Sequence, residues 1–328
     1  MIQGKGYTEG FDPFNNLMQK NVMTVEDVEP YLEDDAIGGK IIDGSEYRQS
    51  LVDYFNNPEP VRGAKLPWGS THFDLRFRTG ETTVWAGINA HGKSMMVGMA
   101  SLGWMAQGES VLNISLEMPA LSTLARMAQQ AAMVSKPSTQ AIDEFCNFML
   151  TKGYIYDHHG SVDQKYIYAA IKCASARGIK HIIIDNLMKC VRGVDDYNAQ
   201  KDFVNNVTQL AQQYKVHCHI VHHIRKQENE LKMPNKFDLT GSGTITDLAD
   251  QVLIVYRNRM KEKILYDSPD NEDALAMPDA YLGCEKNRHG NWEGKVKLWF
   301  NKDCLQYTSD KRRMAVPLMN PKMYEYQG

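Results

Sequence analysis

Residues 87–94 (GINAHGKS) satisfy every fixed position of the phosphate-binding pattern G-x-x-x-x-G-K-[ST]. An apolar, β-branched run precedes the pattern and predicts a buried strand, and the residues that follow it predict the start of a helix. Glycines in such a turn let backbone N–H groups face phosphate oxygens at the positive end of a helix. The pattern therefore predicts a nucleoside-triphosphate site. Its expected members are Gly87, Asn89, Ala90, His91, Gly92, Lys93, Ser94 and Met95. Lys93 is expected to contact the outer phosphates, and the Ser94 hydroxyl to ligate Mg²⁺ as the cofactor.

Two carboxylates follow predicted strands, where open α/β sheets bind their ligands. Asp185 ends an apolar run and is expected to hold Mg²⁺, partly through water. Glu117 follows the strand predicted at 110–115. Sequence position alone leaves two interpretations of Glu117 open. It either polarises the water that attacks the γ-phosphate or interacts electrostatically with the start of the next helix.

Four histidines lie close together, at positions 217, 219, 222 and 223. Such a density suggests zinc, but successive side chains of a strand point to opposite faces, and no matching ligand cluster lies at the short spacing that structural zinc sites use. A histidine at the end of this strand that contacts the γ-phosphate is the better functional hypothesis.

Small residues at 240–244 follow a polar segment that includes Arg225 and Lys226. Free N–H groups in a mobile loop suit contacts to a nucleic-acid backbone, although charge alone favours an ordinary solvated loop. Arg288 lies between another predicted strand and a hairpin, with no evident partner in its own chain. It either contacts the γ-phosphate on a neighbouring subunit or simply faces solvent.

Alternating strands and helices predict an α/β fold with a mainly parallel central sheet covered on both faces. The expected strands are 82–86, 110–115, 154–157, 180–185, 216–222 and 251–256, and the helices lie near 93–107, 119–134, 138–151, 163–177 and 198–215. Segments around 280–285, 294–300 and 304–308 predict shorter, antiparallel edge strands.

The 328 residues are 43% hydrophobic and carry a net charge of −3, which excludes a global basic field for nucleic acid. Six scattered cysteines indicate reduced thiols, and no signal peptide or membrane-length apolar run is evident. We therefore expect a cytoplasmic protein without a membrane partner. Residues 1–62 form a polar N-terminal arm with a helix expected at 45–55, which should pack on the main domain or a neighbouring subunit. Residues 63–308 form the main domain, and 309–328 are expected to be a loosely held tail.

Several of these blocks, in this order, resemble the ATPase domain of the DnaB family of replicative ring helicases. The phage helicase–primase and Twinkle branch is the nearer one. The resemblance covers about 63–308. It rests on the following stretches: LPW (66–68), GINAHGKS (87–94), ISLEMP (114–119), IIIDNLM (182–188), HHIRK (222–226), GSGTITDLADQVLIVYRN (241–258), KNRHG (286–290) and GKVKLWF (294–300).

The resemblance implies a RecA-like fold and a homo-hexameric ring with ATP sites between subunits. It also implies 5′-to-3′ translocation on single-stranded DNA, unwinding of duplex DNA at a replication fork, and replisome partners such as primase and polymerase. If the protein is viral, it acts in the host cytoplasm. The arm becomes the candidate linker between adjacent subunits.

Carried over residue by residue, Glu117 resembles the catalytic carboxylate and His223 the phosphate sensor. Arg288 resembles the trans-acting arginine finger, with Lys286 beside it. The DNA contacts fall on Arg225, Lys226, Thr240, Gly241, Ser242 and Gly243, with a second loop near 192–197. The chain departs from bacterial relatives at Thr240-Gly241, where they carry Arg-Glu, and at Asp247, where they carry Gln. The alternatives are a RecA-like recombinase and another DNA-dependent ATPase that does not unwind.

Overall fold

The computed structural model describes residues 42–56, 63–71, 75–191, 196–224, 230–239 and 242–325. The chain divides into two units, residues 1–58 and 59–328. In the first unit, a short 3-10 helix, η2 (Gly44–Tyr47), leads into α4 (Arg48–Asn56). The Asp43 carboxylate accepts a hydrogen bond from Ser45 N and so caps the start of this segment. The helix expected at 45–55 is confirmed.

The second unit is built on one sheet with the strand order β3-β2-β4-β5-β1-β6-β7-β8-β9 in the part of the chain described above. The strands are β1 (Thr82–Gly87), β2 (Val111–Ser115), β3 (Gly153–Ile155), β4 (His181–Asp185), β5 (His217–His223), β6 (Gln251–Arg257), β7 (Ala280–Asn287), β8 (Gly294–Asn301) and β9 (Gln306–Thr308). From β3 to β6 all neighbours pair in parallel, whereas β7, β8 and β9 are antiparallel. Both the parallel sheet and its antiparallel edge are confirmed.

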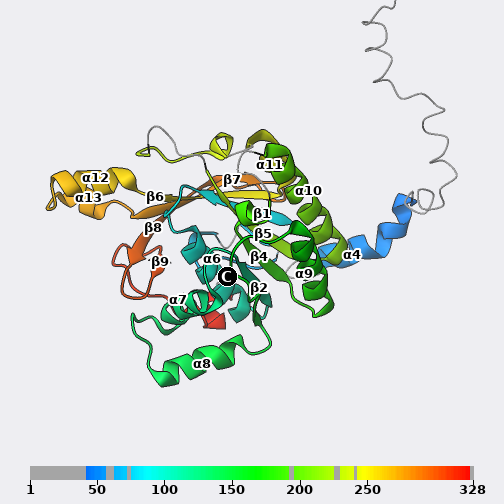
Figure 1. Cartoon of the computed structure of the whole chain (residues 1–328), viewed down its shortest axis with the longest axis horizontal. Coiled ribbons are helices and arrows are strands. Elements are labelled where there is room, and N and C mark those ends of the chain that lie inside the picture. Colours follow the sequence, from blue (N-terminus) through cyan, green and yellow to red (C-terminus); the bar gives the residue numbers. More distant parts are fainter. Residues whose placement is uncertain are drawn as a thin grey trace, which may run out of the picture. The chain divides into compact units, whose positions relative to one another are not determined.

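Helices cover the two faces of this sheet (Figure 1). One face carries α6 (Lys93–Ala106), α7 (Ala120–Ala132) and α8 (Thr139–Met149), and the other carries α9 (Gln164–Ala176), α10 (Tyr197–Tyr214) and α11 (Ser242–Leu248). Strand β1 is buried along its whole length, which explains why its sequence does not alternate between polar and apolar residues. Trp85 packs into the first hydrophobic cluster, while Val84 and Ala86 pack into the second. A strand buried on both faces has no polar side, so period-2 alternation is absent.

Two parts of the fold differ from expectation. The small residues at 242–244 begin helix α11 instead of forming a loop, and Ile245 anchors that helix in the second cluster. Helices α12 (Arg259–Asp267) and α13 (Glu272–Ala276) were not expected. They extend from the sheet between β6 and β7 as a helical hairpin (Figure 1). The Asn258 side chain caps the first turn of α12, and the Asn271 side chain caps that of α13, each by accepting a hydrogen bond from a backbone N–H group.

The C-terminal segment 309–325 packs on the rest of the second unit, so the prediction of a loosely held tail is wrong for these residues. Leu318 and Tyr324 are buried. Val316 N donates to Gln306 Oε1 at 2.7 Å, and Lys65 Nζ donates to Tyr324 O at 2.6 Å. These contacts could not be predicted from the polar, proline-containing sequence, because they depend on tertiary packing and, for Tyr324, on a partner 259 residues away.

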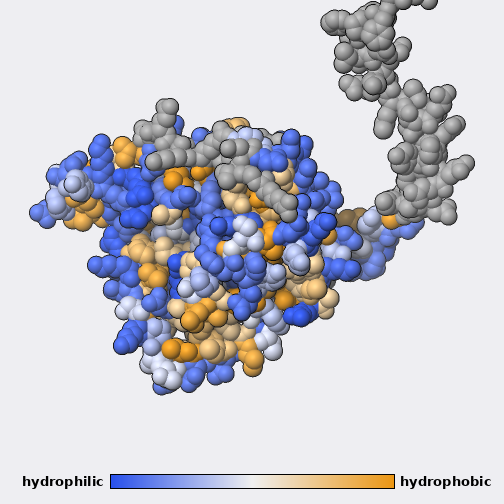
Figure 2. All heavy atoms as spheres, in the orientation of Figure 1, coloured by the Kyte–Doolittle hydropathy of each residue, from blue (hydrophilic) through white to orange (hydrophobic). Residues whose placement is uncertain are grey.

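Apolar side chains gather over α7 and α8 on the face seen in Figure 2. The exposed large ones in and around these helices are Leu121, Met133, Val134, Ile142 and Leu150. Among the described helices, none is long and apolar enough to cross a bilayer.

Candidate active site

The phosphate loop connects β1 to α6, as predicted, and its glycines are required by close packing. A Cβ at Gly87 would lie 2.4 Å from Val255 O, and one at Gly92 would lie 2.2 Å from Tyr307 Oη. Gly92 is also the N-cap of α6 with φ 90°, a left-handed conformation that favours glycine. The loop therefore presents its backbone N–H groups at the start of a helix, the arrangement that binds anions.

Lys93 is turned back onto its own loop. Its side-chain ammonium donates to Gly87 O at 2.8 Å and to Ile88 O at 3.0 Å, and the residue is buried. Burial lowers the pKa of Lys93 to about 8, although Asp185 and Glu117 oppose the shift. The two carbonyls hold the ammonium beside the loop, where phosphate oxygens could replace them as hydrogen-bond acceptors.

Asp185 and Ser94 form a pair of oxygen donors beside the loop. Asp185 ends β4 next to Ser115 of β2, and its side chain is hydrogen-bonded to Ser94. Burial raises the pKa of Asp185, and its Oδ1 has no hydrogen-bond partner among the described residues. A buried carboxylate oxygen without a partner, next to a hydroxyl, fits the hard oxygen ligands that Mg²⁺ prefers. Asp185 and Ser94 therefore fit a magnesium site.

Glu117, Asn186 and His223 meet at the carboxyl edge of the sheet. The Asn186 side-chain amide is hydrogen-bonded to Glu117 Oε1 and lies 2.6 Å from His223 Nε2. His223 Nε2 is 3.3 Å from the same Glu117 oxygen. The hydrogen bond from His223 holds the pKa of Glu117 below its usual range, so the carboxylate is ionised at neutral pH. An ionised carboxylate can accept a proton, and its position near Lys93 favours the catalytic interpretation over the helix-start interpretation.

Asn186 was missed as a functional residue. In the sequence it looks like part of a turn after the strand that ends at Asp185. Only the packing of β2, β4 and β5 side by side brings it between Glu117 and His223. The available signal was its position, because a polar residue directly after a buried parallel strand lies at the ligand-binding edge.

The other phosphate-loop residues divide into two groups. Asn89 and Ala90 are exposed, whereas His91 is fully buried. His91 Nδ1 accepts a hydrogen bond from Arg257 N at 3.1 Å, and burial lowers the pKa of the ring to about 4. The His91 side chain therefore points into the protein as a neutral ring, and contacts to a nucleotide at this position fall to the backbone.

A cavity of about 320 Å³ adjoins the phosphate loop and was also missed. Ala90 and Met95 line it on the loop side. Arg257, ion-paired with Glu262, and Phe300 line it elsewhere. These residues come from β6, α12 and β8, three elements that the sequence does not mark as neighbours of the loop. Met95 thus lines the cavity beside the phosphate loop.

Arg288 and Lys286 lie at the opposite edge of the sheet. Strand β7 runs antiparallel to β6 and pairs Asn287 with Gln251, so its end lies where β6 begins. The six residues of β1 separate this edge from the phosphate loop by roughly 17 Å. The structure does not bring Arg288 or Lys286 to the loop of its own chain.

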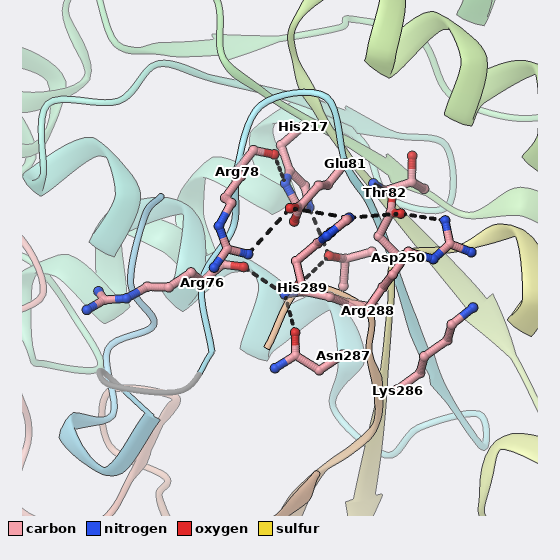
Figure 3. A network of polar contacts seen from close by, with 12 residues as sticks. Arg76, Arg78, Glu81, Thr82, His217, Asp250, Lys286, Asn287, Arg288 and His289 are labelled. Atoms are coloured by element: carbon pink, nitrogen blue, oxygen red, sulfur yellow. Dashed lines mark hydrogen bonds and ion pairs between the residues drawn. The ribbon is translucent and has the colours of Figure 1, made fainter. Parts of the chain in front are cut away.

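The expectation that Arg288 lacks a partner in its own chain is wrong. Its guanidinium donates to Asp250 Oδ1 at 2.9 Å and to Asp247 O at 2.7 Å. Lys286 Nζ donates to Thr246 O at 2.7 Å and to Asp247 O at 3.0 Å. Figure 3 shows Arg288 and His289 both approaching the Asp250 carboxylate.

Most of the residues expected to bind DNA lie outside the described residues, namely Arg225, Lys226, Thr240 and Gly241. Ser242 and Gly243 begin helix α11. In the second expected loop, residues 192–195 also lie outside the described part, and Tyr197 begins α10.

A phosphate loop between β1 and α6, with carboxylates after two neighbouring parallel strands, defines a RecA-like P-loop nucleotide-binding protein. The DnaB-like helicase C-terminal domain family matches residues 75–309, and the chain belongs to this family. Two solved structures have the same fold. One of them, an ATPase domain, has a TM-score of 0.69 at 18% identity, covering 81% of this chain and 99% of that one. The other, a DnaB-like replicative helicase described together with its interactions with primase, has a TM-score of 0.65 at 16% identity, covering 90% of this chain and 74% of that one.

Proposed function

We propose that the protein is a replicative ring helicase that hydrolyses ATP with Mg²⁺, translocates 5′-to-3′ on single-stranded DNA and unwinds duplex DNA. The observation that carries this proposal is the Glu117–Asn186–His223 cluster. It lies at the same sheet edge as Lys93 and Asp185 in a chain of the DnaB-like family. A carboxylate kept ionised beside a phosphate loop suits hydrolysis better than nucleotide binding alone.

In the proposed reaction, Lys93 leaves the carbonyls of Gly87 and Ile88 and donates to the outer phosphates. Ser94 and Asp185 hold Mg²⁺, which neutralises charge on the phosphates when bound. Glu117 orients the attacking water and accepts its proton. His223, hydrogen-bonded through the Asn186 amide, reports whether the γ-phosphate is present.

The cavity beside the loop supports a purine or pyrimidine base as its occupant. Its position next to Ala90 and Met95 continues the phosphate loop, and its walls offer flat groups, the Arg257 guanidinium and the Phe300 ring. Phe300 itself packs against Tyr307 with ring centroids 4.9 Å apart. Guanidinium and aromatic planes are favourable surfaces for stacking a base.

The position of Arg288 supports a homo-hexameric ring with sites between subunits. A residue at the edge opposite the phosphate loop is unable to reach its own nucleotide, but in a head-to-tail ring this edge faces the neighbour's loop. Arg288, with Lys286 beside it, is then the trans-acting finger. In the first unit, Leu51 and Phe55 of α4 are exposed, which supports docking of the arm on a neighbouring subunit.

The proposed DNA contacts remain Arg225, Lys226 and residues 240–243, and the proposed partners are primase and polymerase in the cytoplasm. The decisive experiment is unwinding of forked DNA with 5′ or 3′ tails, measured with ATP and with a non-hydrolysable analogue. We expect strand separation only with ATP and a 5′ tail. Hydrolysis without strand separation would instead favour a recombinase or another DNA-dependent ATPase.

A further inference from the structure

Asp250 lies at the centre of the network at the edge opposite the phosphate loop (Figure 3). The residue is buried, and both of its carboxylate oxygens are occupied. Oδ1 accepts from the Arg288 guanidinium at 2.9 Å, and Oδ2 accepts from Thr82 N at 2.8 Å. The backbone repeats these links, because Asp250 N donates to Thr82 O and Arg288 N donates to Asp250 O, both at 2.9 Å. Asp250 thus ties the end of β7 to the start of β1.

The same guanidinium also closes the end of α11. The last carbonyls of a helix have no partner within it, and cations at that end are favourable. Arg288 donates to Asp247 O, and Lys286 donates to both Thr246 O and Asp247 O. The other end of α11 begins at Ser242, inside the segment proposed to bind DNA.

We propose that Asp250 is a positioning residue that docks Arg288 on the C-terminal end of α11, so that α11 links the neighbour's nucleotide to the DNA-binding segment. The inference rests on the proposed function in one respect, namely that Arg288 acts on a neighbouring subunit. Arg288 then has two alternative sets of acceptors: Asp250 and the α11 carbonyl within the chain, or the phosphates of the neighbour's nucleotide.

The two sets exclude each other because one guanidinium serves both. When Arg288 turns to the neighbour's nucleotide, Asp247 O loses a donor and the last turn of α11 is less restrained. Because Arg288 is half-exposed while Asp250 is buried, the arginine moves and the carboxylate stays. Conversely, DNA that displaces α11 makes Arg288 available to the neighbour. Binding at either site therefore favours binding at the other.

The chain offers a matched pair of variants for the test. Asp250→Asn removes the charge that holds Arg288. Asp247→Asn removes the same charge from an exposed side chain on the same helix end but keeps the backbone carbonyl. The first measurement is hydrogen–deuterium exchange of residues 242–248 without nucleotide. We expect Asp250→Asn to raise exchange about fivefold, the scale expected when a charge-assisted hydrogen bond becomes neutral. Asp247→Asn should match the wild type.

The second measurement is the ATP hydrolysis rate of the full-length ring with and without single-stranded DNA. We expect the Asp250→Asn ring to hydrolyse faster without DNA, so its stimulation by DNA falls about fivefold. The ratio should stay as in the wild type for Asp247→Asn. If Asp250→Asn does not fold, Asp250→Glu keeps the charge, displaces the carboxylate by one methylene, and should shift both measurements in the same direction.

Equal exchange in the two asparagine variants would overturn the docking role of Asp250. Raised exchange with an unchanged DNA stimulation would overturn the link through α11. The exchange measurement needs no nucleotide, so it separates this proposal from the trans-acting role of Arg288. That role is tested by the loss of hydrolysis in Arg288→Ala.

Discussion

The two edges of the central sheet differ in whether their charged side chains are paired within the chain. At the carboxyl edge, Asp185 keeps a buried oxygen without a partner among the described residues, and Lys93 donates to two carbonyls of its own loop. At the other edge, both carboxylate oxygens of Asp250 accept hydrogen bonds. The two terminal nitrogens of Arg288 donate to Asp250 Oδ1 and to Asp247 O. The first edge is ready to receive a ligand. The second must open a contact within the chain before it can act on a neighbour.

The direction of the strands explains this difference. Parallel strands bring Gly87, Ser115, Asp185 and His223 to one edge, because each element ends there. Strand β7 runs antiparallel to its neighbour β6, so the residues that follow β7 lie beside the start of β1 and not at the carboxyl edge. The phosphate-loop residues and Arg288 therefore lie at opposite ends of the strands, separated by the length of a strand.

Arg288→Ala should have the largest effect at the second edge. We expect ATP hydrolysis by the ring to fall by about 10³-fold or more, the scale of arginine fingers, while separate subunits still bind nucleotide. Arg312→Ala is the control, because Arg312 is exposed and pairs with Asp310. Mixed rings of Lys93→Ala and Arg288→Ala subunits should recover activity, since some interfaces then combine an intact loop with an intact finger. Undiminished hydrolysis by Arg288→Ala would make the interfacial site wrong.

Glu117→Gln should cause the corresponding loss of ATP hydrolysis at the first edge. Glutamine keeps the size of the side chain and one acceptor oxygen, but its neutral amide does not accept the proton of water. We expect kcat to fall by about 10²-fold with little change in nucleotide affinity. Steady-state kinetics measure kcat, and equilibrium binding measures the nucleotide affinity. Glu144→Gln, at an exposed position of α8, is the control. An unchanged kcat would return Glu117 to the electrostatic interpretation.

Acid should weaken the second edge first, because buried histidines lie beneath it. His217 Nδ1 donates to Arg78 O at 2.6 Å, and its Nε2 is hydrogen-bonded to Thr83 Oγ1 at 2.8 Å. His181 Nδ1 lies 3.1 Å from His219 Nε2. Burial lowers the pKa of His217 to about 3, and those of His181 and His219 well below the usual value. A base with a lowered folded-state pKa stabilises the fold fully above its unfolded pKa, and this stability is lost as pH falls towards the folded pKa.

For His217 the expected loss is about 2 kcal/mol between about pH 6.5 and pH 5. Denaturant melts at the two pH values measure the free energy of unfolding. His217→Gln should reduce the difference between the two melts, whereas His159→Gln, at an exposed position, should leave it unchanged. A pH difference that survives His217→Gln in full would assign the effect to other groups.

The smallest expected effect returns to the first edge and concerns Lys93. With a pKa of about 8, the free protein loses the Lys93 charge as pH rises through that value, while bound phosphates favour the charged form. Nucleotide affinity should therefore fall by up to about tenfold per pH unit above the pKa, and binding should take up a proton there. Calorimetric titration with an ATP analogue in two buffers measures both. Lys93→Arg, which stays charged, should abolish the proton uptake if it still binds.

Much of the fold followed from local patterns. Strands such as 82–87 and 181–185 were predictable because apolar, β-branched runs between turn residues are typical of buried parallel strands. Helix α11 was not, because its first residues, Ser242 and Gly243, are poor helix formers. It is stabilised by burial of Ile245 and by cations at its last carbonyls, all of them contacts with distant parts of the chain.

The sequence by itself determined the nucleotide site, since a phosphate loop is a contiguous motif whose chemistry lies in its own backbone, lysine and hydroxyl. It also identified Glu117, Asp185 and His223 as candidates, because the end of a parallel strand is a predictable place. Only the tertiary structure decided what these residues contact. Asn186 joins Glu117 to His223, and Arg288 is docked on Asp250, through strand neighbours that lie tens of residues apart. Such contacts depend on the sheet order and on the direction of β7, and neither is encoded in any short stretch of the chain.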